Sequence, residues 1–158
     1  MLCISPLMAR GTYQEPAEFL NEIFKSEVPT ANVIWLTGDI KKTATKILYH
    51  KPNRLRIRYW KKEQRSVWIL DEIGKEKPIT AGIVINNNKI ERVKVLIFRE
   101  SRGDEIRHDF FTSQFRQAQL KTDTQLDRSI DGISGATMSV RALIKLSRLA
   151  LFLSTQIK

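Results

Sequence analysis

The chain has 158 residues, of which 42% are hydrophobic and 28% charged, and its formal net charge is +10. These proportions are typical of a globular domain with a hydrophobic core and exclude a disordered chain. No run approaches the ~20 apolar residues that a membrane-spanning helix needs, and the single cysteine excludes an internal disulfide framework.

The first residues differ in character from the rest. Met1–Ala9 is mostly apolar and ends in a small residue before Arg10. This pattern is typical of the end of a secretory signal whose basic start and most of whose apolar core are missing. We expect a signal-peptide remnant over residues 1–9, with a leading strand as the alternative, and a single domain over residues 10–158.

Helical spacing and strand alternation predict the next elements in chain order. Pro16 suits the first turn of a helix, and a later helix has to end before Pro52. The expected elements are a helix over Glu15–Lys25, a helix over Gly38–Tyr49, a strand over Arg54–Trp60 and a strand over Ser66–Ile73.

A hairpin is predicted from Ile79–Ile85 and Ile90–Phe98, two segments rich in β-branched residues. The residues between them include three asparagines, which tolerate positive φ in tight turns. In the second strand we expect Val93, Val95 and Ile97 to share one apolar face.

The remainder of the chain is expected to be helical or irregular. Phe110–Phe115 predicts a helical turn that packs on the sheet, residues 117–129 predict a polar connection, and Met138–Leu153 predicts a long helix. Helices at both ends of a run of hairpin-linked strands predict a single α+β domain with a mostly antiparallel, curved sheet flanked by helices.

Positive charge is concentrated in one region, and more of it lies on one face of the last helix, at Arg141, Lys145 and Arg148. Such a patch is compatible with a solvated strand face, an acidic redox partner, anionic lipid or nucleic acid. No nucleic-acid-binding motif accompanies it, so we expect no nucleic acid partner. The concentrated residues are Arg54, Arg56, Arg58, Lys61, Lys62 and Arg65.

A glycine-containing loop, Asp131-Gly132-Ile133-Ser134-Gly135-Ala136-Thr137, leads directly into the long helix. Its small residues would let a ligand approach the backbone closely. Unpaired N–H groups and the positive end of the dipole make a helix N-terminus favourable for phosphate. The pattern therefore predicts a phosphate site beside the Thr137 hydroxyl. The alternative is an ordinary turn with Ser134 as the helix N-cap.

This loop matches the pattern D-x-x-S-G-A-T and resembles the flavinylation site of the FMN-binding domain family. The family includes flavin subunits of sodium-pumping NADH:quinone oxidoreductase and of the Rnf complex. Further matches are Asp71–Lys75 and the loop Glu100-Ser101-Arg102-Gly103 after the hairpin. Together the matches span roughly residues 68–145.

The resemblance implies that FMN is the cofactor and that a flavin transferase, with FAD as donor, joins it to Thr137 through a phosphodiester. Ser134, Gly135 and Ala136 would then form the phosphate side of the loop with Gly132. Asp131 would be read by the transferase. No metal site is expected, because His50 and His108 have no metal-ligand spacing.

For the isoalloxazine ring, the resemblance implies contacts from the loop after the hairpin. Glu100 or Ser101 would hydrogen-bond the ring, and Arg102 would offset the negative charge of the ring or phosphate. The alternative is that Glu100 and Arg102 are solvated charges at a strand end.

The predicted function is an electron carrier rather than a self-contained enzyme. Its partners would be a flavin transferase and membrane-bound or soluble redox proteins, and an acidic surface would suit the latter. The resemblance places the domain in the periplasm or elsewhere outside the cytoplasm. Two rivals remain: a module that binds FMN or another phosphate ligand noncovalently, and a basic adaptor that never receives flavin.

Overall fold

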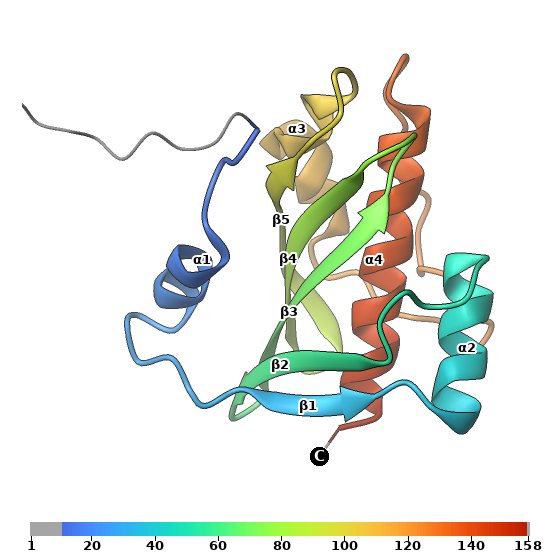
Figure 1. Cartoon of the computed structure of the whole chain (residues 1–158). Coiled ribbons are helices and arrows are strands. Elements are labelled where there is room, and N and C mark those ends of the chain that lie inside the picture. Colours follow the sequence, from blue (N-terminus) through green and yellow to red (C-terminus); the bar gives the residue numbers. More distant parts are fainter. Residues whose placement is uncertain (1–10, 158) are drawn as a thin grey trace, which may run out of the picture.

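A five-stranded antiparallel sheet forms the middle of the protein in a computed structural model, which describes residues 11–157 (Figure 1). The strands lie in sequence order across the sheet. The signal-remnant prediction for residues 1–9 lies outside the described residues. The strands are β1 (Asn32–Trp35), β2 (Arg56–Lys62), β3 (Arg65–Ile73), β4 (Pro78–Asn86) and β5 (Lys89–Phe98).

Helices cover both faces of this sheet. One face carries α1, and α4 crosses the other face with α2 beside it (Figure 1). Within residues 11–157, no helix combines the length and the apolar character needed to cross a membrane. The helical elements are α1 (Pro16–Ile23), α2 (Gly38–Leu48), η1 (Asp104–Arg107), α3 (Asp109–Thr112), η2 (Ser113–Phe115) and α4 (Thr137–Thr155). The predicted α+β class with an antiparallel sheet is confirmed.

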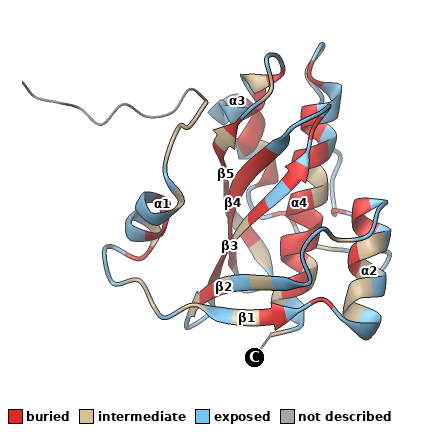
Figure 2. Ribbon diagram, viewed as in Figure 1, coloured by how far each residue is buried: buried red, intermediate tan, exposed pale blue. Residues whose placement is uncertain are grey.

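The larger core lies between the sheet and α4. Leu143, Leu146, Ala150 and Leu153 recur at helical spacing along α4, and all are almost fully buried. They pack against the inner faces of β3 and β4, which Figure 2 shows as largely buried strands. This packing fixes α4, and with it the position of the predicted loop at its N-terminus.

A smaller core lies under α1 on the opposite face. Phe19 and Phe24 pack there against Trp60 and Leu96. Trp60 belongs to the arginine face of the predicted 54–60 strand, so that face is partly covered by α1 instead of being wholly solvated.

The predicted hairpin is confirmed, because β4 and β5 pair across a turn in which Asn87 and Asn88 have φ values of 52° and 64°. The prediction for Ile97 is wrong. The register shifts between Thr80 and Ala81, which pair with Ile97 and Val95, so Leu96 is the extra residue of a β-bulge. Ile97 therefore packs with Leu96 on the α1 side, away from Val93 and Val95.

Two other features differ from the sequence-based expectation. The short strand β1 was not predicted, since its four residues carry no extended alternation. Arg148 does not share a solvated face with Arg141. It is only 3% exposed, and its Nε donates to the Thr124 carbonyl at 2.6 Å, because the polar connection after residue 117 folds over this part of α4.

Candidate functional site

Thr137 is the first residue of α4, and its side chain is exposed. The N-cap is Ala136, which has no side-chain oxygen and makes no capping hydrogen bond. The first turn also contains no acidic residue. The N-terminus of this 19-residue helix therefore has neither a side-chain cap nor an acidic residue in its own first turn to offset its positive partial charge.

The loop before Thr137 is open on its outer side. No heavy atom of the described residues lies within 4 Å of the position that a Cβ would take on Gly132 or Gly135, apart from their chain neighbours. Gly135 adopts a φ of +83°, which brings the chain through a turn closed by the Ala136 N–H and the Ile133 carbonyl at 3.0 Å. Ser134 is exposed and does not cap the helix, so the predicted alternative of a Ser134 N-cap is wrong.

The start of this loop is held by a residue that the sequence analysis did not single out. Gln114 in η2 accepts a hydrogen bond from the Asp131 N–H at 2.7 Å and donates its amide to the Asp131 carbonyl at 3.2 Å. The Asp131 side chain is left exposed. A glutamine 17 residues upstream carries no local sequence signal for such a contact.

The loop after β5 lies directly against the start of α4. Gly103 adopts a φ of +94°, and a Cβ on it would approach the Ser139 Oγ to 2.6 Å and the Ala136 Cβ to 3.7 Å. Only glycine permits this approach with this backbone conformation. The structure thus brings the two predicted segments, residues 100–103 and 131–137, together.

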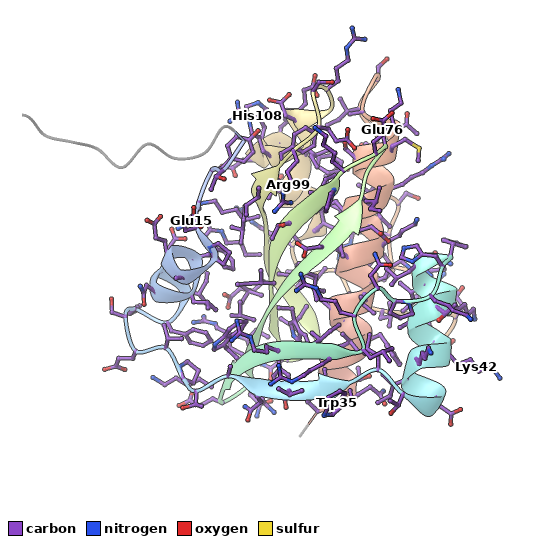
Figure 3. The ribbon with its side chains drawn as sticks, viewed as in Figure 1. Glu15, Trp35, Lys42, Glu76, Arg99 and His108 are labelled. Carbon is purple, nitrogen blue, oxygen red and sulfur yellow. The ribbon has the colours of Figure 1, made fainter. Side chains whose placement is uncertain are left out.

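Glu100 has a defined partner in the β3–β4 turn. Its Oε1 accepts hydrogen bonds from the backbone N–H groups of Lys75, Glu76 and Lys77 at 3.0, 2.5 and 2.6 Å. These bonds, that from Lys77 foremost, lower the pKa of Glu100 below its ordinary value. Figure 3 shows Glu76 at the end of the sheet where α4 begins.

Ser101 and Arg102 are exposed, and no described side chain pairs with either of them. They remain open to a ligand beside the loop, and their predicted flavin contacts stay predictions. Glu100 differs, because one of its carboxylate oxygens is already occupied by three amides.

Met138 follows Thr137 in the first turn of α4 and is 44% exposed. Trp68 is fully buried, stacks on Tyr59 at 4.9 Å and donates its indole N–H to Ser66, so it is inaccessible to a ligand at this end.

A model of the FMN-binding domain family matches residues 74–151. This chain belongs to the FMN-binding domain family. The matched range begins in the turn held by Glu100, runs through β4 and β5, and ends within α4. FMN is accordingly its cofactor. None of the curated proteins compared with the chain matches it.

The residues around the start of α4 have the chemistry needed to bind a phosphate-bearing group. The uncapped α4 offers backbone N–H donors, the glycines leave room above them, and the exposed Thr137 hydroxyl lies in the same turn. Arg102 adds a cationic side chain on the neighbouring exposed loop.

Proposed function

We propose that this FMN-binding domain is an electron carrier outside the cytoplasm whose FMN is joined to Thr137 through a phosphodiester. The observation that carries the proposal is the exposed hydroxyl in the first turn of an uncapped helix. A phosphate is stabilised there by N–H groups that otherwise have only water as partner.

Attachment requires a flavin transferase with FAD as the donor. The Thr137 Oγ1 forms a bond to the phosphorus on the riboflavin side, the phosphoanhydride bond of FAD breaks, and AMP leaves. The hydroxyl proton is released to the transferase or to water. Ser134, Gly135 and Ala136 line the phosphate side, Gly132 keeps that side open, and Asp131 is presented to the transferase as an exposed carboxylate.

FMN, when bound, supplies redox chemistry with one or two electrons. The chain orients the cofactor and adjusts its potential. Ser101 can hydrogen-bond the ring from an exposed loop, and Arg102 stabilises negative charge beside it. Glu100 holds the adjacent turn through the three amide contacts described above, so Ser101 is the better candidate for the ring contact.

The electron donor and acceptor are separate proteins. A net charge of +10 favours redox partners with an acidic surface, since complementary charge raises the rate of encounter. The location follows from the attachment step, because the transferase of this family acts outside the cytoplasm.

The test is intact mass spectrometry after co-expression with a flavin transferase in the periplasm. The expected product carries one FMN moiety, which stays on the chain after denaturation. Thr137→Val should remove it completely, whereas Thr122→Val, a change at another exposed threonine, should leave it. Yellow colour that leaves the denatured polypeptide would reject the covalent linkage in favour of noncovalent FMN binding.

A further inference from the structure

A groove opens where β2 and β3 diverge. β2 pairs with β3 only from Tyr59 to Lys62, and its first half pairs with β1 instead. The last half of β3, Ile69–Ile73, therefore pairs with β4 along one edge. Its other edge forms no strand pairing with β2. Figure 1 shows β2 turning away from β3 at this point. A cavity of about 820 Å³ occupies the fork.

The groove has a mixed lining in which apolar surface exceeds polar surface. It reaches both hydrophobic cores, because the diverging strands leave a passage between the two faces of the sheet. Its apolar lining includes Leu36, Leu48, Ile57, Trp60, Ile69 and Leu149. A volume of this size lies in the range of ordinary small-molecule sites, ~300–1,000 Å³.

The rim of the groove is basic. Four arginines from three segments line it: Arg54, Arg56, Arg58 and Arg99. Figure 3 shows Arg99 over the upper half of the sheet. Two other basic residues of the predicted patch differ, since Lys62 pairs with Glu27 at 3.2 Å and Arg65 with Glu91 at 2.8 Å.

The two acidic residues of the groove are already engaged. Asp71 accepts a hydrogen bond from the Thr80 hydroxyl at 2.5 Å, and Arg54 approaches it at 3.7 Å. Glu72 is only 4% exposed and meets the His50 Nε2 at 2.9 Å. Neither carboxylate neutralises the remaining arginines.

Three arginines of the rim have no carboxylate within ion-pair distance among residues 11–157. The Arg56 side chain has no hydrogen-bond or ion-pair partner among these residues. Arg58 lies over the Trp60 ring at 5.5 Å, and Arg99 donates to the Pro78 carbonyl at 2.8 Å and to the Thr80 hydroxyl at 3.1 Å. Surplus positive charge thus borders a lining that is more apolar than polar.

We propose that this groove binds a small molecule that joins an apolar body to a carboxylate. The apolar body fills the fork beside Ile57 and Ile69, and the carboxylate pairs with Arg56 at the rim. Arginine suits this role because its planar guanidinium matches a carboxylate through two parallel hydrogen bonds.

One end of the groove, at Arg99, adjoins the loop proposed to contact the flavin ring, but the groove does not include the proposed attachment loop, and the inference does not depend on that function. None of residues 131–137 lines it. The residue of α4 that does, Leu149, lies twelve positions after Thr137, about 18 Å along the helix axis.

The test is calorimetric titration of the full-length chain, in a preparation without flavin absorbance, with decanoate below its micellar concentration. We expect saturable 1:1 binding that weakens with salt, and about tenfold weaker binding of decanol, which has the same chain without the charge. Absence of saturable decanoate binding to the folded protein would overturn the proposal.

Variants locate the binding. Arg56→Gln should weaken decanoate binding about tenfold, since a charge-assisted hydrogen bond is lost. Arg116→Gln makes the same charge change at an exposed residue outside the groove and should leave the affinity within about twofold. Ile57→Trp should block the site by filling it, with thermal unfolding as the check of folding. Equal effects of Arg56→Gln and Arg116→Gln would contradict the assignment.

An anionic membrane surface offers related chemistry, and a vesicle experiment separates the two sources. Phosphatidylglycerol vesicles should sediment the wild-type and Ile57→Trp chains equally, because a filled groove does not alter the surface charge. If Ile57→Trp binds decanoate as well as the wild type does, the ligand lies on the basic surface and the proposed groove site is wrong.

Discussion

The Gln114 side chain and the Asp131 backbone form a closed pair of hydrogen bonds, with the Asp131 N–H donating at 2.7 Å and the Gln114 amide donating at 3.2 Å. The pair ties the loop before α4 to η2, which packs on β5. The loop is otherwise open at Gly132 and Gly135. Gln114 therefore limits the freedom of the loop that leads to Thr137.

Gln114→Ala should slow flavin attachment about tenfold, since the loop must then be ordered during each encounter with the transferase. The measurement is a time course of intact mass with a purified flavin transferase and FAD. Gln119→Ala, at an exposed glutamine whose side chain makes no hydrogen bond to residues 11–157, is the matched control. Equal rates for the two variants would show that the Gln114 contact does not affect attachment.

Gly103→Ala should destabilise the fold by about 1–2 kcal/mol, because an alanine is strained at a φ of +94° and its Cβ would collide with the Ser139 Oγ. Urea unfolding measures the change. Gly132→Ala is the control, since the space around Gly132 is open, and it should alter stability by less than about 0.5 kcal/mol. If Gly103→Ala unfolded at the same urea concentration as the wild type, the packing described for this loop would be contradicted.

Glu100→Gln should destabilise the protein by up to about 1 kcal/mol at pH 7, because an ionised acceptor of three backbone N–H groups is replaced by a neutral one and solvent screens these exposed contacts. The pKa of Glu100 is lowered in the folded protein. Its stabilisation is therefore present above the ordinary carboxylate pKa and is lost as the pH falls through the folded value. The difference in urea midpoint between wild type and variant should shrink between about pH 5 and pH 2. A constant difference over that range would exclude the ionised contact.

The His50 side chain should stabilise the folded protein at low pH, and this stabilisation should disappear at high pH. Both ring nitrogens face oxygens, with Nδ1 at 2.8 Å from the Lys51 carbonyl and Nε2 at 2.9 Å from Glu72, so both donate only in the protonated form. The hydrogen bond to Lys51, followed by Glu72, raises the pKa of His50 against the opposing effect of burial.

A raised pKa gives stabilisation that is complete below the ordinary histidine value and disappears as the pH rises through the folded value. His50→Gln should therefore lower the unfolding free energy by about 1–2 kcal/mol at about pH 5.5, where wild-type His50 is protonated, and by less at about pH 8.5. Urea titrations at both pH values measure this. His108→Gln, at an exposed histidine, is the matched control. A larger loss at the higher pH would contradict the assigned direction.

Local patterns in the sequence account for most of the helices and strands. Segments rich in β-branched residues predicted β4 and β5, the asparagines between them predicted their turn, helical spacing predicted α1 and α2, and a run of good helix formers predicted α4. The small residues before Thr137 also pointed to an open helix start by themselves. All of these depend on residues within a few positions of one another, whose φ and ψ preferences act locally.

Contacts between distant segments required the tertiary structure. The bulge at Leu96, the amides that surround Glu100, the Gln114–Asp131 pair and the groove between β2 and β3 each join segments whose spacing carries no periodic signal. Such contacts depend on how packed elements are placed relative to one another. The sequence alone thus determined most of the elements and the motif at Thr137, whereas packing of α4 on the sheet decided which side chains surround that motif.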